Sequence, residues 1–127
     1  MIMLDTDVLV DFERGLPESV EWLSTLSESC ICGFAAMELL NGCQNRSDRV
    51  RVDKVLAGFS VVWPSSADME RALRQFRRLK LSHGLGLVDS LIAATAVGYD
   101  YDLATFNQRH FAAVPGLKLL QPYPRQA

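Results

Sequence analysis

Three acidic residues, Asp5, Glu38 and Asp89, lie among apolar neighbours, where an unpaired carboxylate is unfavourable. Asp5 directly follows the apolar run Met1–Leu4, and the other two stand in apolar segments rich in helix formers. If the three side chains converge, their like charges repel and need a cation between them. Oxygen ligands without a histidine cluster favour magnesium or manganese over zinc. The pattern therefore predicts a divalent-metal site in which an activated water attacks a phosphodiester.

Each of these acids also has a purely structural explanation. Asp5 and Asp89 could be helix N-caps, each contributing about 1 kcal/mol, and Glu38 could pair with a basic side chain. For each acid considered alone, these structural explanations stay open. Convergence of the three side chains would favour a metal site over them. His83 and His110 are candidates for the general base of a metal-free ribonuclease. A local hydrogen bond is the simpler explanation for His110, so we expect the acids to carry the chemistry.

The remaining charges are grouped along the chain. We expect Asp7 to cap a helix, near enough to Asp5 to reach a second metal through water, and Asp11 to be a surface acid. A net charge of −2 and a pI of about 5.6 give no global basic field that would draw in nucleic acid. Any such contact must be local. The basic residues form two groups, each of which could simply be a solvated helix face: Arg46, Arg49, Arg51 and Lys54, and Arg71, Arg74, Arg77, Arg78 and Lys80.

Short apolar segments alternate with amphipathic ones, which predicts a three-layer α/β/α fold with a parallel sheet of four to five strands. Sites in such folds form beyond the carboxyl ends of the strands, near the switch in strand order. We expect residues 1–127 to form a single domain. The expected strands are 1–4, 29–34, 59–63, 102–105 and 117–120. Four helices are expected at 8–13, 35–41, 88–97 and 107–111. Three more are expected: one that begins near residue 17, a charged one that carries Val52, Val55 and Leu56, and one that begins near residue 65.

Two of these helices have marked ends. Ser65, Ser66 and Asp68 resemble a helix start, and the helix that follows should bury one apolar stripe with the arginines on its opposite face. That stripe consists of Met69, Ala72, Leu73, Phe76 and Leu79. The apolar helix 88–97 should be buried and end at Gly98.

Cysteine usage and hydropathy indicate a cytoplasmic protein. Cys30, Cys32 and Cys43 have neither zinc-knuckle nor redox-pair spacing, so we expect buried free thiols. The chain has no basic segment before its first apolar run and no apolar stretch of about 20 residues. We therefore expect neither secretion nor membrane insertion.

Three motifs, in order, resemble those of the PIN-domain ribonucleases, and within them the VapC-type toxins of bacterial toxin–antitoxin pairs. They are 3–9, 36–42 and 89–94, read as MLDTDVL, AMELLNG and DSLIAA. A fourth and weaker match, 103–111, has Asn107 where many members of the family carry an aspartate. A neutral amide attracts a second cation less strongly, so we expect one tightly held metal, with a second only when substrate phosphate contributes ligands.

The resemblance implies a PIN-like, Rossmann-like domain with endoribonuclease activity on tRNA or other structured RNA. It further implies Mg²⁺ as cofactor, with Mn²⁺ able to substitute, a homodimer, and a small VapB-like antitoxin that covers the acidic site. Asp5, Glu38 and Asp89 are then the catalytic residues and metal ligands, with Glu38 able to act through water and Asn107 a weak or water-mediated ligand. Supporting polar residues are Thr6, Asp7 and Thr105, and candidates for RNA contacts are Arg74, Arg77, Arg78, Lys80 and Arg109.

Two other functions remain open at this point. The opening Asp5-Thr6-Asp7 also resembles the haloacid-dehalogenase phosphatases, in which the first aspartate is a nucleophile, but Asp89 lacks the acidic neighbour that those enzymes need. A non-catalytic module that binds metal weakly is the second alternative, and Asn107 keeps it open. The sequence does not say which RNA is cut, or where.

Overall fold

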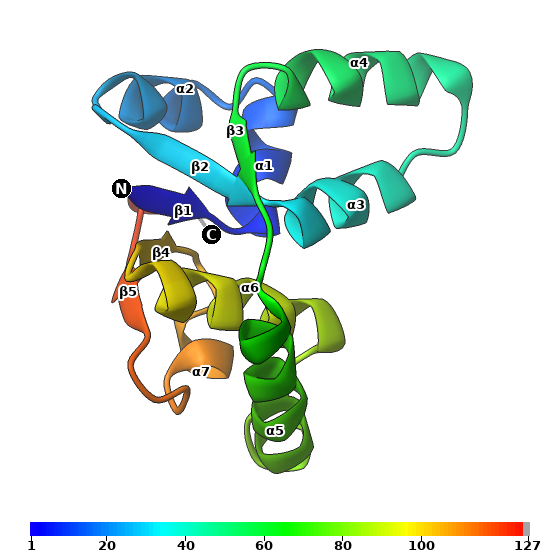
Figure 1. Cartoon of the computed structure of the whole chain (residues 1–127). Coiled ribbons are helices and arrows are strands. Elements are labelled where there is room, and N and C mark those ends of the chain that lie inside the picture. The colour runs from blue at the N-terminus through cyan, green and yellow to red at the C-terminus, as the bar shows by residue number, and fades with distance from the viewer. Residues whose placement is uncertain (126–127) are drawn as a thin grey trace.

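In the computed structural model, which describes residues 1–125, short strands alternate with helices (Figure 1). The strands are β1 (Ile2–Leu4), β2 (Ser29–Cys32), β3 (Ser60–Val62), β4 (Asp102–Ala104) and β5 (Lys118–Leu120). The helices are α1 (Thr6–Glu13), α2 (Pro17–Ser24), α3 (Gly33–Asn41), α4 (Arg46–Leu56), α5 (Ser66–His83), α6 (Leu87–Tyr99) and α7 (Gln108–Phe111). Every segment that the sequence predicted is present, with ends that differ by one or two residues.

The strands form one parallel sheet in the order β3-β2-β1-β4-β5. Figure 1 shows α1, α2 and α4 on one side of the strands and α5, α6 and α7 on the other. The predicted three-layer architecture and parallel sheet are therefore confirmed. Strands β1, β2 and β4 are covered on both faces, and most of their apolar residues are buried, among them Met3, Leu4, Ile31 and Leu103.

Strand β1 is the point at which the chain switches from building one side of the sheet to building the other. From β1 the chain moves outward through β2 to β3, then crosses back to β4 on the other side of β1 and continues to β5. Leu4 at the end of β1 is in register with Ala104 at the end of β4. The residues that follow these two, Asp5 and Thr105, therefore leave the same sheet edge side by side, at the place where parallel folds form their sites.

Strand β2 ends earlier than the sequence predicted. Gly33 and Phe34 belong to α3 and not to the strand. A Cβ atom at Gly33 would overlap the indole ring of Trp63, which packs edge-on against Phe34 with 5.6 Å between ring centroids. A side chain at Gly33 would have to displace the Trp63 ring, a tertiary contact that the local apolar pattern does not indicate.

Helix α5 begins as predicted, but its apolar stripe is divided. The backbone N–H of Asp68 donates to Ser65 Oγ at 3.1 Å, and the N–H of Ser65 donates to Asp68 Oδ2 at 3.0 Å, which makes a complete capping box. Ala72 and Leu79, on the side that packs on α6, are buried. Met69 and Leu73 are 42% and 58% exposed, so the expectation of one buried stripe was wrong.

Helix α6 continues past Gly98, where the sequence predicted its end. The left-handed residue that terminates it is Asp100, with φ of 59°. Gly98 serves another purpose, because a Cβ atom there would overlap the buried carboxylate of Asp68. The glycine therefore permits close packing of α6 on the start of α5.

Cys30 and Cys32 are buried free thiols, as predicted, and Cys43 is free and half-buried. Among residues 1–125, no helix combines the length and the apolar character that a bilayer crossing requires.

Candidate active site

Asp5 is the most buried carboxylate at the carboxyl edge of the sheet, with 2% of its surface exposed. It is the N-cap of α1, and its Oδ1 accepts the N–H of Thr6 at 2.8 Å. Its Oδ2 accepts the hydroxyl of Thr105 at 2.7 Å. Burial first, and then the charge of Asp7, raise the pKa of Asp5 to about 7. This carboxylate is therefore held in a place that penalises its ionised form.

Asp7 faces the same edge and does not cap the helix, contrary to the sequence expectation. Its Oδ2 accepts the backbone N–H of Phe106 at 3.0 Å and lies 3.3 Å from the hydroxyl of Thr105. Burial raises the pKa of Asp7 as well, against the lowering effect of that backbone hydrogen bond. Asp7 thus ties the loop after β4 to the start of α1, directly beside Asp5.

Asp89 reaches this edge from α6. It lies in the first turn of the helix, where its Oδ2 accepts the N–H of Gly86 at 3.1 Å. Its charge is a third influence that raises the pKa of Asp5, so the two carboxylates lie within electrostatic range of each other. Asp5, Asp7 and Asp89, together with Thr105, are called the acid edge below.

Glu38 and Asn107 lie at the margin of the acid edge. Glu38 is half-buried on α3 and borders two depressions, one of which also contains Thr6 and the other Val88. It is not among the groups whose charge shifts the pKa of Asp5. Asn107 is exposed just before α7, and its backbone N–H donates to Thr105 Oγ1 at 3.0 Å. Because Thr105 Oγ1 is the acceptor in that bond, its own hydroxyl proton is directed toward the carboxylates.

The donor set fits a hard cation that keeps several waters. Among residues 1–125, no three His, Cys, Asp or Glu side chains are grouped so that all could hold one ion directly. Thr6 Oγ1 and Asp7 Oδ1, however, are buried oxygens without a hydrogen-bond partner. Such orphaned oxygens require an explanation in a folded protein. Magnesium binds through one or two carboxylates and retains waters, and Asp5 with Asp7 supply that number.

A cluster behind the acid edge was missed by sequence reasoning. Asp11, expected at the surface, is 6% exposed and accepts the hydroxyl of Tyr123 at 2.7 Å and a guanidinium N–H of Arg125 at 3.0 Å. Burial and the bond to Asp11 raise the pKa of Tyr123 to about 12, which keeps its hydroxyl a donor. Arg125 also lies over the ring of Phe106, 4.3 Å from its centroid. The end of the chain thereby clamps the loop that holds Asp7.

The spacing of Asp7 and Asp11, four residues apart on α1, is the one sequence signal that could have indicated this clamp. It places both side chains on neighbouring turns of one helix face. Nothing in the local pattern around Tyr123 identifies it as the partner, because the contact spans 112 residues.

The predicted RNA-contacting residues lie apart from the acids. Arg74, Arg77, Arg78 and Lys80 are exposed on α5, and Arg109 is exposed on α7. Helix α7 packs against α5, so these side chains share one side of the molecule. The four residues on α5 are called the basic ridge below. The structure therefore separates a buried acidic site from an exposed basic surface.

Comparison with known proteins agrees with this geometry. Residues 2–117 match the PIN domain family model. The chain is 36% identical over 122 residues to ribonuclease VapC10 of Mycobacterium tuberculosis, covering 93% of this chain and 91% of the relative. It is also 36% identical over 125 residues to ribonuclease VapC19 of the same organism, covering 93% and 98%.

Solved structures give the same grouping. A toxin–antitoxin complex from Klebsiella pneumoniae contains a chain with a TM-score of 0.77 and 27% identity, covering 97% of this chain and 98% of that one. In fold alone, the chain is similar to a chain of VapBC2 from Rickettsia felis, with a TM-score of 0.77 and 24% identity. This alignment covers 94% of this chain and 98% of that one. The acidic motifs, the strand order that joins them and these likenesses agree, and the chain belongs to the PIN-domain family, within its group of VapC-type ribonucleases.

Proposed function

We propose that the chain is a divalent-metal-dependent endoribonuclease, the toxin of a VapBC-type pair. Two observations support this proposal: Asp5 and Asp7 both contact Thr105 at the strand-order switch, with Asp89 near enough for its charge to act on Asp5, and the chain is 36% identical to proteins named ribonucleases. The family match over residues 2–117 also favours a nuclease over the haloacid-dehalogenase alternative.

Asp5 and Asp7 would supply the first protein ligands for Mg²⁺, or Mn²⁺ in its place, and Asp89 would contribute from α6. Glu38 and Asn107 act from the margin through water. When bound, the cation supplies a Lewis acid for the phosphodiester and an activated water. Thr105 holds Asp5 by its hydroxyl, and the N–H of Phe106 holds Asp7, so that both carboxylates keep their positions as substrate enters.

The expected partner is an antitoxin, and a solved relative in complex with one supports this. A homodimer, implied by the family resemblance, is supported by the exposed apolar side chains Met69 and Leu73 on α5. Light scattering of the purified chain checks the dimer, and co-purification with a co-expressed VapB-like antitoxin checks the partner.

The deciding experiment is cleavage of structured RNA in Mg²⁺ or Mn²⁺ by the wild-type chain, Asp5→Asn and Asp89→Asn. We expect each variant to lose at least about 100-fold in rate, because a carboxylate near the ion is replaced by a neutral amide. Asp53→Asn is the matched control, since Asp53 is exposed on α4 and its one ion pair within residues 1–125 is with Arg49 at 3.8 Å. Equal rates in all four proteins would refute the proposed function.

Manganese calorimetry separates the enzyme from a non-catalytic module. Micromolar Mn²⁺ binding that is lost in Asp5→Asn supports the nuclease. A complex with the antitoxin that forms equally well with Asp5→Asn, in a protein that binds no Mn²⁺, would support a scaffold instead.

A further inference from the structure

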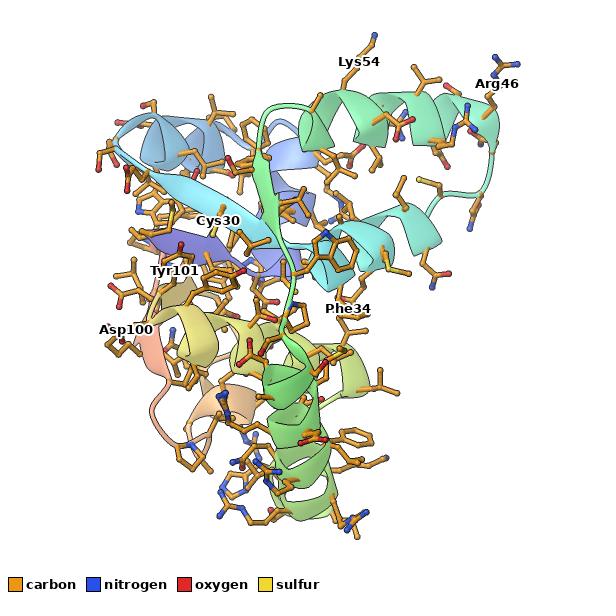
Figure 2. The ribbon with its side chains drawn as sticks, viewed as in Figure 1. Cys30, Phe34, Arg46, Lys54, Asp100 and Tyr101 are labelled. Carbon is orange, nitrogen blue, oxygen red and sulfur yellow. The ribbon has the colours of Figure 1, made fainter. Side chains whose placement is uncertain are left out.

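The stretch 71–88 is strongly basic in a protein whose net charge is −2. It contains five arginines and lysines and no acidic residue: Arg71, Arg74, Arg77, Arg78 and Lys80. Arg71 pairs with Asp68 at 2.7 Å. Within residues 1–125, no member of the basic ridge forms an ion pair. In Figure 2, blue nitrogen atoms gather around the lower part of α5 beside α7. Cations left unpaired on an acidic protein form a local attraction for a polyanion.

A depression lies between the end of α5 and α7, next to the basic ridge. Its volume is about 340 Å³, and it is called the basic pocket below; it is lined by Ser82, His83, Gly84, Arg109 and His110. Each of its side chains has at least one nitrogen or oxygen that can donate a hydrogen bond, and none is acidic. The pocket therefore combines the donor types that bind phosphate.

Two local contacts bring residues of the basic pocket together. His83 Nδ1 lies 2.8 Å from Ser82 Oγ, which fixes the orientation of its ring. Gly84 adopts the left-handed conformation that ends α5, with φ of 68°, and a Cβ atom there would lie 3.7 Å from His110 Nε2. The turn thus brings the end of α5 against the imidazole of His110, so that both histidines border one space.

The basic pocket follows the acid edge closely along the chain, through Asn107. Asn107, whose N–H holds Thr105, precedes the first residue of α7, and Arg109 and His110 follow within one helical turn. With a rise of about 1.5 Å per residue, His110 stands only about 5 Å further along the chain axis. An RNA strand with its scissile phosphate at the acid edge has neighbouring phosphates within reach of this short helix.

We propose that the basic pocket binds a phosphate group of the RNA substrate outside the scissile position, with the basic ridge continuing the path along α5. Arg109 contacts the phosphate through its guanidinium, and Ser82, His83 and His110 surround it with further donors. This inference rests on the proposed function and extends it to a binding subsite. His83 and His110 are then substrate-binding residues and not the general base.

The test is cleavage kinetics combined with RNA binding in EDTA, which needs no metal and no turnover. The variants are Arg109→Gln and the double change His83→Gln with His110→Gln, and Arg46→Gln on α4 is the matched control. We expect Arg109→Gln to raise KM about 10-fold with kcat within about twofold, and to weaken binding of fluorescent RNA in EDTA similarly. The slope of log affinity against log salt should fall by about 0.7 to 1. Arg109→Lys should show a smaller effect, because it keeps the charge but loses the planar fork.

Unchanged KM, unchanged RNA affinity and an unchanged salt slope in both variants would overturn the proposal. So would a loss of antitoxin binding with RNA binding intact, because the pocket would then receive an acidic segment of a protein. Mn²⁺ affinity, measured in parallel, should stay at the wild-type value in these variants. A wild-type chain that binds neither Mn²⁺ nor RNA would instead refute the proposed function, so the two failures are distinguishable.

Discussion

The acid edge and the basic ridge are built in opposite ways. At the acid edge, Asp5 is buried and Asp7 half-buried, both accept hydrogen bonds from residues that follow β4, and burial raises the pKa of each carboxyl. On the basic ridge, cations are exposed, and none of them has an acidic partner among residues 1–125. At the acid edge, ionised carboxylates are destabilised, and a bound cation would stabilise them. On the basic ridge, the positive charges are available to bind a polyanion. The acid edge therefore depends on the fold, whereas the ridge depends on its surface charge alone.

The largest effect should come from removing the buried charge of Asp5. Its folded pKa of about 7 exceeds the ordinary value of 3.8, so the native state holds this proton more tightly than the unfolded state. Stability of the metal-free protein should thus fall as pH rises between these values, and the cost is complete above pH 7. Asp5→Asn should raise the free energy of unfolding at pH 8 by up to about 4 kcal/mol, and by much less near pH 4.

Urea unfolding in EDTA at the two pH values measures this difference. Saturating Mn²⁺ should stabilise the wild-type chain and leave Asp5→Asn unaffected. Asp53→Asn should behave as wild type. A lower stability of Asp5→Asn at pH 8 would mean that the acid edge is not strained by charge, and the contrast with the basic ridge would fail.

The next effect concerns the hydroxyl that spans the sheet edge. Thr105→Val removes the donor to Asp5 while keeping nearly the same shape, and we expect cleavage to fall about 10- to 100-fold, as for other residues that orient metal ligands. Thr105→Ser retains the hydroxyl and should retain most activity. Initial rates and Mn²⁺ calorimetry measure the change, and comparable losses in both variants would assign Thr105 a packing role only.

A smaller effect should follow from loosening the clamp behind the acid edge. Tyr123→Phe deletes the hydrogen bond to the buried Asp11, and we expect a loss of about 1.5 kcal/mol in the free energy of unfolding. Tyr99→Phe is the control, because the Tyr99 hydroxyl makes an exposed bond to the Trp63 carbonyl at 3.3 Å. The free energy of unfolding is measured by thermal or urea unfolding. Equal changes in the two variants would show that the clamp contributes nothing specific.

The smallest effect should come from a single cation of the basic ridge. Arg77→Gln should raise KM for RNA about twofold at low salt and less at higher salt, because exposed charges are screened. Stability should stay within about 0.5 kcal/mol of wild type. Steady-state kinetics at two salt concentrations checks this, and an effect on kcat without one on KM would place Arg77 in the chemistry.

The sequence was most informative where a local pattern has one structural meaning. The capping pair Ser65 and Asp68 and the strand before Asp5 have such patterns, and the structure contains both as predicted. The position of Asp5 at the sheet edge follows from parallel topology, so it too was predictable. The metal ligands themselves remain a prediction, although Asp5 and Asp89 lie on the same edge.

Features that depend on distant contacts were not predictable. Examples are the packing of Trp63 over Gly33, the close approach of Gly98 to Asp68, and the bond between the buried Asp11 and Tyr123. Asp7 was misread for the same reason, since its partners Thr105 and Phe106 lie 98 and 99 residues away. A single sequence records that these residues are present, but not which of them meet.

The bond between Asp5 and Thr105 joins residues 100 positions apart, and it has a consequence for the cell during synthesis. At a translation rate of about 5–20 residues per second, roughly 5–20 s separate the appearance of the two residues. Until β4 emerges and pairs with β1, the growing chain lacks both the neighbouring strand and the hydroxyl that holds the carboxylate. We therefore expect a chain terminated before residue 102 to lack the assembled acid edge and to cleave no RNA, which a cleavage assay of the truncated chain would check.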